Sequence, residues 1–336
     1  MKKLSVRGVF RVSGAVVLLA AAGTVPAHAA AGDASGTARG ERAGGAQEER
    51  YVALGDSMAS GPLIPDITGP VACARSTHNY GHELARTLGV ADYRDVTCSG
   101  AATKHMTEPQ ELKLGDVPAG TAAPQLDALG QDTTLVTLTI GGNDTGLVGV
   151  AQNCFQLDPR GARCQDEYTE NGVDTVARRI EEFGPKLDAV LDGIEQRAPR
   201  ASVLVTGYGD YVKPGGCWPK VAVLPSDADW LQGSVNHMNR VIADRADAHG
   251  AAYVDVFTPS RGHDACQAPK DKWVEGFVPT SLAAPLHPNR QGEENYARII
   301  HEHMQNQNQA QTQPQTEPQG QPQPSSTAPG ARTGGE

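Results

Sequence analysis

Short runs of β-branched and other apolar residues recur along the middle of this chain, and longer amphipathic stretches separate them. Such runs are typical of buried strands, and strands that alternate with helices form a parallel sheet with helices on both faces. We therefore predict an α/β domain, a three-layer α/β/α sandwich around a mainly parallel five-stranded sheet. The predicted strands cover residues 51–54, 92–98, 134–140, 202–207 and 252–257.

The amphipathic stretches predict the helices. In residues 173–197 apolar side chains return every three or four positions, which places them on one helical face. These side chains are Val176, Ile180, Phe183, Leu187, Val190, Leu191 and Ile194. Further helices are predicted over 79–88, where Gly89 ends the helix, over 227–249 and over 291–304.

The two ends of the chain differ in composition from its middle. Near the N-terminus, basic residues precede an apolar run over 15–22, and an A-x-A cleavage site follows over 27–29. We predict a signal peptide over 1–29, a flexible leader over 30–49, the folded domain over 50–304 and a disordered Gln- and Pro-rich tail over 305–336. The mature protein is therefore expected to be secreted and extracellular.

Net charge limits the partners of this chain. Its 29 Lys and Arg against 39 Asp and Glu give a formal net charge of -10, and loss of the four basic residues in 1–29 leaves 25 against 39, or -14. An acidic surface argues against nucleic acid and anionic lipid as electrostatic partners. No stretch after the signal approaches the ~20 apolar residues of a membrane-spanning helix. We expect a monomer without stable membrane insertion.

The six cysteines all follow the predicted signal peptide. An even number in an exported chain favours disulfides over free thiols, although many pairings are possible. Sequence order alone suggests that neighbours pair, Cys73 with Cys98, Cys154 with Cys164 and Cys217 with Cys266. Zinc binding is the weaker interpretation, because there is no C-x-x-C and no cysteine has the usual spacing to a histidine. We expect no metal and no cofactor.

A serine follows the first predicted strand. The strand breaks at Gly55, and Asp56 and Ser57 come next. Ligands bind at the carboxyl ends of strands in an open parallel sheet, so this hydroxyl would face a cleft. Alone, a Gly-Asp-Ser tripeptide more often forms a turn or a helix N-cap. With the features described next, we interpret Ser57 as a nucleophile whose own N–H faces a developing oxyanion.

Two later strand ends carry candidate oxyanion donors. Asn143 follows Gly141 and Gly142 after the third strand, and its side-chain amide can donate to a negatively charged oxygen. Gly100, after the second strand, offers a main-chain N–H with no side chain to block the cleft. Each is an ordinary loop residue when taken alone. Their succession at strand ends predicts an oxyanion hole of Ser57, Gly100 and Asn143.

The predicted general base is His287, which lies just before the last helix and next to Pro288. A neutral imidazole can accept the serine proton during attack and return it to the leaving group. Most other histidines lie in the signal peptide or in helical stretches, whereas the local sequence leaves His105 and His263 open as alternatives.

The order of these blocks resembles the GDSL family, also called SGNH hydrolases, in which a serine, a glycine, an asparagine and a histidine follow one another. The matching residues are Gly55, Asp56 and Ser57, then Gly100, then Gly141, Gly142, Asn143 and Asp144, then His287, Pro288 and Asn289. The chain looks most like the secreted actinobacterial, Streptomyces-type lipases and esterases of that family. This resemblance implies a flavodoxin-like SGNH hydrolase fold and ester hydrolysis through an acyl-enzyme on Ser57.

One departure from the family pattern concerns the acid of the triad. The family usually has an aspartate three residues before the histidine, and this chain has Ala284 there. The resemblance to the secreted branch implies that a main-chain carbonyl of Ala284 or Pro285 orients His287 instead. Asp264 is the alternative, as a more distant acid.

The resemblance leaves the ester substrate open. The apolar and proline-rich segment 58–71 looks like a wall of the cleft, which favours acyl chains and a lipase or phospholipase A activity. A polysaccharide acetyl esterase is the alternative among enzymes. A non-catalytic secreted binding protein on a lapsed hydrolase fold is the alternative of another class, motivated by the missing acid and the long tail. Asp56 and Asp144 invite catalytic roles, but both follow turns next to helix starts, where carboxylates cap exposed N–H groups, so we predict structural roles for both.

Overall fold

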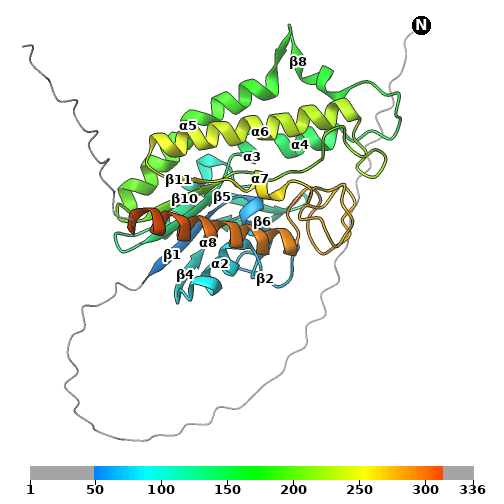
Figure 1. Ribbon diagram of the computed structural model, residues 1–336. Helices are drawn as coiled ribbons and strands as arrows, with labels where there is room; N and C mark the ends of the chain where they lie inside the picture. Colours follow the sequence, from blue (N-terminus) through cyan, green and yellow to red (C-terminus); the bar gives the residue numbers. More distant parts are fainter. Residues whose placement is uncertain (1–48, 313–336) are drawn as a thin grey trace, which may run out of the picture. The chain divides into compact units, whose positions relative to one another are not determined.

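The computed structural model describes residues 49–312, so the predicted signal peptide, nearly all of the leader and the tail beyond Thr312 lie outside the described residues. Its main sheet has five strands in the order β11-β10-β7-β1-β4, and every neighbouring pair is parallel (Figure 1). The strands are β1 (Arg50–Gly55), β4 (Asp92–Asp95), β7 (Leu135–Thr139), β10 (Ser202–Thr206) and β11 (Ala252–Val254). The predicted parallel five-stranded sheet is confirmed.

Strand β1 occupies the position in the sheet where the chain reverses its direction of winding. The second strand of this sheet in chain order, β4, lies on one side of β1, and the later strands β7, β10 and β11 extend on the other side. This is the flavodoxin-like order, and ligands bind at the carboxyl ends of the strands where such a reversal occurs. The carboxyl ends of β1, β4 and β7 are therefore the expected place for a site.

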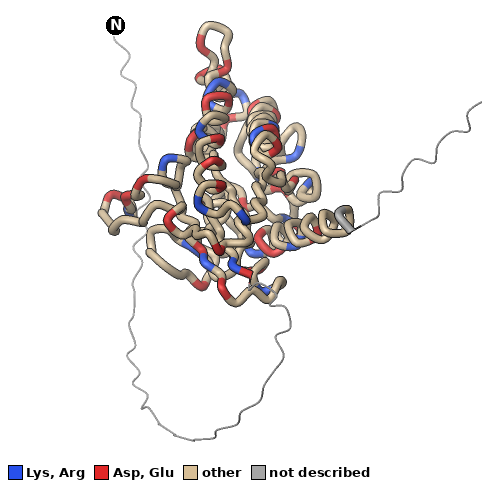
Figure 2. Tube along the Cα trace, turned by 90° about the vertical axis from the view of Figure 1, so that its left-hand side faces the viewer, with Lys and Arg blue, Asp and Glu red and all other residues tan. Residues whose placement is uncertain are grey.

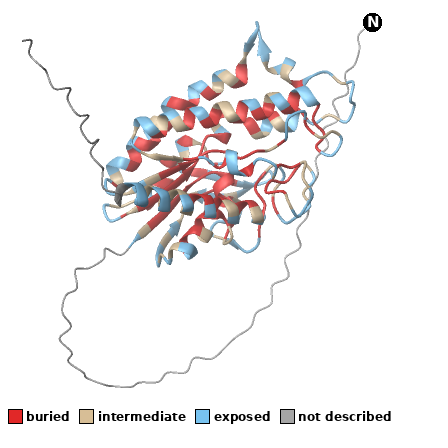
Figure 3. Cartoon of the chain, viewed as in Figure 1, coloured by how far each residue is buried: buried red, intermediate tan, exposed pale blue. Residues whose placement is uncertain are grey.

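Two long helices cover one face of the sheet. They are α5 (Thr175–Arg197) and α6 (Pro225–Ala248), which lie above the strands in Figure 1. Val52 and Leu54 of β1 belong to the apolar cluster on this face, together with Ile180 and Phe183 of α5. Figure 3 shows buried residues along the inner side of both helices and exposed residues along the outer side, as expected for amphipathic helices.

The other face is covered by α2 (Tyr80–Leu88) and α8 (Arg290–Thr312), which lie on the opposite side of the sheet from α5 and α6 in Figure 1. Tyr51 and Ala53 of β1 belong to the apolar cluster on this side, with Leu84 of α2 and Ile300 of α8. Consecutive residues of a strand point to opposite faces, so β1 contributes to both layers of the core. The predicted three-layer sandwich is confirmed.

Shorter elements surround the sheet. Three two-stranded antiparallel sheets are formed by β2 (Ile67–Thr68) with β3 (Arg75–Ser76), β5 (Gln110–Leu114) with β6 (Val117–Ala122), and β8 (Thr169–Glu170) with β9 (Val173–Asp174). The short helices are α1 (Ser57–Ser60), α3 (Gly142–Thr145), α4 (Leu147–Asn153) and α7 (Phe257–Ser260). Helices α1 and α3 begin directly beyond β1 and β7, at the carboxyl edge of the sheet.

Helix α8 extends further than its sequence pattern predicts. We expected the folded domain to end at residue 304 and a disordered tail to follow, whereas α8 continues to Thr312. Residues 305–312 contain neither glycine nor proline, and glutamine and alanine are good helix formers. Once the buried turns of α8 have formed, adding further turns needs no new nucleus. A helix can therefore continue here without burying its side chains.

Three disulfides tie loops together, and they join Cys73 to Cys98, Cys154 to Cys164 and Cys217 to Cys266. These are the neighbour pairs that sequence order suggested. Figure 2 shows acidic and basic residues distributed along the trace. Between residues 49 and 312, no helix combines the length and the apolar character needed to cross a membrane.

Candidate active site

The candidate nucleophile lies in a turn that only glycine permits. Gly55 ends β1 with φ +149°, and a Cβ at this position would lie 2.5 Å from the carbonyl oxygen of Thr139. The Asp56 N–H donates to the same Thr139 carbonyl at 2.9 Å, which closes the turn against β7. The Gln125 side chain accepts from Gly55 N at 2.7 Å and donates to Gly55 O at 2.9 Å. Ser57 follows as the first residue of α1.

Ser57 and His287 meet at hydrogen-bond distance. The Nε2 atom of His287 lies 2.7 Å from Ser57 Oγ, although 230 positions separate the two residues in sequence. Both residues are 8% exposed, so they border the solvent without being immersed in it. Burial holds the pKa of His287 below its usual 6.5, which keeps the imidazole neutral and able to accept a proton.

The second nitrogen of His287 contacts the main chain. Its Nδ1 atom lies 2.7 Å from the carbonyl oxygen of Pro285, and this contact assigns the proton to Nδ1 and leaves Nε2 as the acceptor. The Ala284 carbonyl instead accepts from the main-chain N–H of His287 at 3.3 Å. Of the two carbonyls considered from the sequence, that of Pro285 contacts the ring.

Asp264 makes its contacts away from this pair. It is fully buried, and it accepts from Cys266 N and from Gln267 Nε2, both at 2.8 Å. The other two histidines left open by the sequence also have partners of their own. His105 Nδ1 accepts from the N–H of Ala102 at 2.9 Å, and His263 stacks on Trp273 at a centroid distance of 4.2 Å.

The loop that carries His287 is anchored by a buried ion pair. The Lys272 ammonium lies 2.5 Å from the Glu275 carboxylate, with the two side chains 3% and 0% exposed. The same carboxylate accepts from Asn289 Nδ2 at 3.0 Å, and the Glu275 N–H donates to the His287 carbonyl at 2.9 Å. The ammonium and these donors hold the pKa of Glu275 at about 2, below its usual 4.5, although burial opposes the shift.

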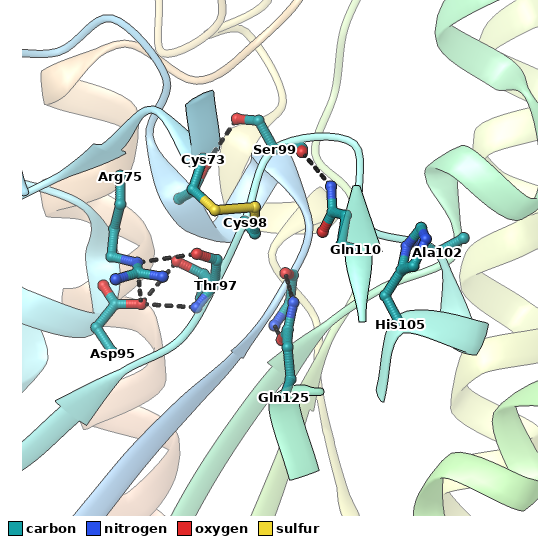
Figure 4. Close-up of a disulfide and its surroundings, with 12 residues drawn as sticks. Cys73, Arg75, Asp95, Thr97, Cys98, Ser99, Ala102, His105, Gln110 and Gln125 are labelled. Atoms are coloured by element: carbon teal, nitrogen blue, oxygen red, sulfur yellow. Dashed lines mark hydrogen bonds and ion pairs between the residues drawn. A yellow bond between two sulfur atoms is a disulfide. The ribbon is translucent and has the colours of Figure 1, made fainter. Parts of the chain in front are cut away.

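The candidate donor Gly100 lies in a loop pinned to its neighbours. Figure 4 shows the Cys73–Cys98 disulfide just before this loop, together with the hydrogen bond from Gln110 Nε2 to Ser99 O, which measures 2.8 Å. Gly100 has φ +79°, a conformation that side-chain-bearing residues rarely adopt. The loop is thus held at both sides while Gly100 itself remains exposed.

The candidate donor Asn143 lies in α3, beyond the end of β7. Its amide donates to the Ala101 carbonyl at 2.7 Å, which leaves the second hydrogen of the NH₂ group available. The preceding Gly142 N–H donates to the Tyr208 hydroxyl at 2.8 Å, and that hydroxyl donates to Asp56 at 2.7 Å. A hydrogen-bonded chain therefore links the Asn143 turn to the residue before Ser57.

The two aspartates expected to have structural roles make different contacts. Asp56 caps α1 as predicted, since its side chain accepts from Met58 N at 2.9 Å. Burial raises the pKa of Asp56 to about 7, although its hydrogen bonds oppose that shift. Asp144 does not cap α3; its carboxylate accepts from the main-chain N–H and the hydroxyl of Thr103, the first residue of a 3-10 helix (Thr103–Met106), which is a structural contact as expected.

An apolar pocket opens beside Ser57, with a cavity of about 90 Å³. Its apolar walls come mainly from α4, from α6 and from the chain between β10 and α6; they include Leu147, Val148, Val212, Val221, Val223, Leu231, Val235 and Met238. The segment 58–71, predicted to form this wall, contributes only Met58. Ile64 of that segment is buried outside the pocket lining, and Leu63 is 58% exposed, so the segment does not form the predicted wall.

Several supporting residues have no recognisable signal in the amino-acid sequence. Gln125, Tyr208, Lys272 and Glu275 act through contacts with distant parts of the chain, and Gln125 is separated from Gly55 by 70 positions. A glutamine in a loop or a tyrosine after a strand has no local pattern that indicates such a partner. Among residues 49–312, no cluster of His, Cys, Asp and Glu is arranged to hold a metal ion.

Comparison with known proteins gives consistent matches. Residues 53–294 match the GDSL-like Lipase/Acylhydrolase family. Lipase 2 of Streptomyces coelicolor is 36% identical over 257 residues, which cover 74% of this chain and 83% of the relative. A lipase of Streptomyces rimosus is 32% identical over 250 residues, covering 74% of this chain and 83% of the relative.

Solved structures agree with the sequence matches. Phospholipase A1 from Streptomyces albidoflavus superposes with a TM-score of 0.63 at 28% identity, over 76% of this chain and 99% of the other. An extracellular lipase from Streptomyces rimosus gives a TM-score of 0.60 at 28% identity, with the same coverage.

Proposed function

This chain belongs to the GDSL-like lipase/acylhydrolase family of carboxylic ester hydrolases, and on that premise we propose that it is a secreted serine hydrolase acting on acyl lipids. In this proposal Ser57 is the nucleophile and His287 is its general base. The observation that carries the proposal is the 2.7 Å contact between Ser57 Oγ and His287 Nε2, with His287 Nδ1 on the Pro285 carbonyl.

Acylation begins when Ser57 Oγ attacks the ester carbonyl carbon and its proton passes to His287 Nε2. The carbonyl oxygen becomes an oxyanion, which the N–H groups of Ser57 and Gly100 and the Asn143 amide are proposed to bind. Collapse of this intermediate breaks the bond to the alcohol, which leaves with the proton from His287. The acyl group remains on Ser57 as an ester.

Deacylation repeats these steps with water. The water attacks the acyl carbon and gives a proton to His287 Nε2. His287 then returns that proton to Ser57 Oγ as the carboxylic acid leaves. Through both half-reactions the Pro285 carbonyl accepts a hydrogen bond from the Nδ1–H group, which keeps its proton, and so holds the ring in one orientation. A carbonyl dipole stabilises imidazolium less than a buried carboxylate would, so the proposed catalytic unit is a dyad with main-chain assistance.

The proposed substrate is a lipid ester with an apolar acyl chain. The pocket beside Ser57 is lined almost entirely by aliphatic and aromatic side chains, which suits a hydrocarbon chain. A polysaccharide acetyl ester would need polar partners for its sugar hydroxyls, and this lining offers few. Relatives described as lipases and phospholipase A1 support the same substrate class.

The test is hydrolysis of p-nitrophenyl esters from acetyl to palmitoyl by the purified protein, beside Ser57→Ala and His287→Ala. Each variant is expected to lose about 10⁴-fold or more in kcat, because nucleophile and base act as one unit. Ser226→Ala, at an exposed position of α6, and His301→Ala on α8 are matched controls and should keep their activity.

The outcome separates the proposal from its two alternatives. If wild type hydrolyses none of the esters and acetylated polysaccharide also stays intact, the chain is a binding protein and the proposal is wrong. If wild type releases acetate from polysaccharide and ignores the longer esters, the acetyl esterase is correct. Activity that survives Ser57→Ala would exclude the proposed nucleophile.

Export is proposed from the N-terminal sequence and the disulfides. Three disulfides are typical of proteins in oxidising compartments, and a lipase of similar fold is described as extracellular. We expect protein from the culture medium to begin at Ala30, after cleavage at the A-x-A site. N-terminal sequencing tests this. An uncleaved chain found only inside the cells would contradict it.

A further inference from the structure

Large apolar side chains are exposed on three loops around the candidate site. Val278 is 81% exposed and Leu282 is 72% exposed, both in the segment that leads to His287. Leu157 is 67% and Phe155 is 44% exposed, just after α4, and Leu63 is 58% exposed after α1. We call these five side chains the apolar rim.

The three loops of the apolar rim are in contact with one another. The Phe155 ring packs edge-on against Phe277, the residue before Val278, at a centroid distance of 5.2 Å. The Ala284 N–H donates to the carbonyl of Pro62, the residue before Leu63, at 2.9 Å. In Figure 1 the orange-brown loops before α8 and the green loop after α4 lie at the same end of the molecule. The rim is therefore one region of the surface.

The apolar rim is continuous with the pocket. Phe277 and Leu286 line the pocket beside Ser57, and they lie in the same loop as Val278 and Leu282. An apolar path therefore leads from the candidate nucleophile to the outer surface. Soluble proteins rarely expose large contiguous apolar patches, and such patches mark interaction sites. The acyl chain of a lipid that leaves a membrane would follow this path into the pocket.

The loop before His287 is held with its apolar side chains outward. The buried Glu275 carboxylate accepts from the N–H of Thr280 at 2.8 Å and from the hydroxyl of Ser281 at 2.7 Å. These bonds direct the polar groups of the loop toward the protein, while Val278 and Leu282 on either side stay in solvent. The hydrophobic effect alone does not favour this loop conformation, because it leaves the Val278 and Leu282 side chains in water.

Charge selects the kind of surface that could cover the rim. Residues 276–286 contain no Asp, Glu, Lys or Arg, and beside Leu157 the exposed charges of Asp158 and Arg160 lie 3.6 Å from each other, while the expected mature chain carries a formal net charge of -14. Anionic membranes attract basic segments, which this loop lacks. An uncharged or zwitterionic lipid surface meets no electrostatic penalty here and offers apolar tails to the rim.

We propose that the apolar rim docks the protein onto a zwitterionic lipid–water interface, with the pocket beside Ser57 facing the lipid. The use of this docking in lipid hydrolysis rests on the proposed function, whereas the docking itself is measured without catalysis. Each rim side chain that enters the interface should strengthen partitioning by about tenfold.

The experiment measures partitioning onto phosphatidylcholine vesicles by sedimentation, in a Ser57→Ala background so that the lipid stays intact. Val278→Ser/Leu282→Ser should weaken partitioning about 100-fold, and Val278→Ser alone about tenfold. Val173→Ser is the matched control, because Val173 is 52% exposed but lies on the β8–β9 hairpin. With Ser57 intact, all of these variants should hydrolyse a water-soluble acetyl ester as wild type does.

The result that would overturn the proposal is equal partitioning of the rim variants and the Val173→Ser control, or no partitioning of the Ser57→Ala parent at all. Stronger binding to phosphatidylglycerol than to phosphatidylcholine would overturn the choice of a zwitterionic surface. A dimer in light scattering that becomes a monomer in the double variant, with vesicle binding unchanged, would assign the rim to a second copy of the chain. Vesicle binding by a wild-type protein that hydrolyses no ester would leave docking standing and refute the proposed function.

Discussion

Replacing Glu275 by glutamine tests whether the buried ion pair holds the His287 loop. Glutamine keeps the shape and one carbonyl acceptor, but it leaves the Lys272 ammonium without a counter-charge at 3% side-chain exposure. Removing one partner of a buried ion pair costs roughly 3–5 kcal/mol, mostly because the remaining charge stays desolvated. Since Thr280 or Ser281 can still donate to the amide oxygen, we expect a loss of about 3 kcal/mol in the free energy of unfolding.

The pH dependence gives this prediction a sign. The pKa of Glu275 is about 2 in the folded protein and 4.5 as its usual value. The stability that this carboxylate contributes is therefore fully present above pH 4.5 and is lost as the pH falls toward 2. The difference between wild type and Glu275→Gln should stay constant above that window and shrink within it.

Urea denaturation with the disulfides intact measures the difference at about pH 7 and at steps down to about pH 3. The matched control is Glu294→Gln, which removes an exposed ion pair with Arg290 whose side chains are 50% and 55% exposed. That pair should contribute at most about 1 kcal/mol. If Glu275→Gln costs no more than this control, or if its cost does not shrink in acid, the ion pair does not anchor the loop.

Three further predictions follow from the site. The acid limb of kcat/KM in a pH–rate profile should have its midpoint below pH 6.5, because burial lowers the pKa of His287 and the neutral ring is the active form. A midpoint above that value would contradict His287 as the buried general base. Tyr208→Phe leaves the Gly142 N–H without its acceptor, so we expect roughly tenfold lower kcat on a soluble ester. The free energy of unfolding from urea titration should fall by about 1–3 kcal/mol. An unchanged kcat would show that this hydrogen-bond network does not act in catalysis. Gly141→Ala should cost at least about 2 kcal/mol in the same titration, because its Cβ would lie 2.6 Å from the Phe183 ring at φ +126°, and a neutral result would refute the steric argument.

The fold was predictable because its signals are local. Each core strand is a short apolar run, and each long helix shows its apolar face in the spacing of its own residues. Boundaries were less certain, since α5 begins at Thr175 with Asp174 as its N-cap, and α8 continues to Thr312. The alternative end points of a helix or strand differ little in free energy, and tertiary contacts select one of them.

The positions of the candidate catalytic residues were predictable for a related reason. A strand that ends in a glycine turn delivers the next side chain to the carboxyl edge of the sheet, so the positions of Ser57, Gly100 and Asn143 follow from strand order. The pocket wall could not be predicted this way. Its lining comes from α4 and α6 and not from the segment after Ser57, because helices pack according to the whole core.

The amino-acid sequence by itself determined the strand and helix pattern, the order of the four motif blocks and the absence of an aspartate at position 284. Only the tertiary structure decided that the Pro285 carbonyl faces His287 and that Glu275 is buried against Lys272. The hydrogen bond from the Tyr208 hydroxyl to Asp56 was also decided only there. The spacing of apolar residues determines helices and strands through residues that are close in the sequence. The three contacts named above join residues whose distance in space depends on how the helices pack on the sheet. A buried polar group needs a partner, and the folded core determines which partner is within reach.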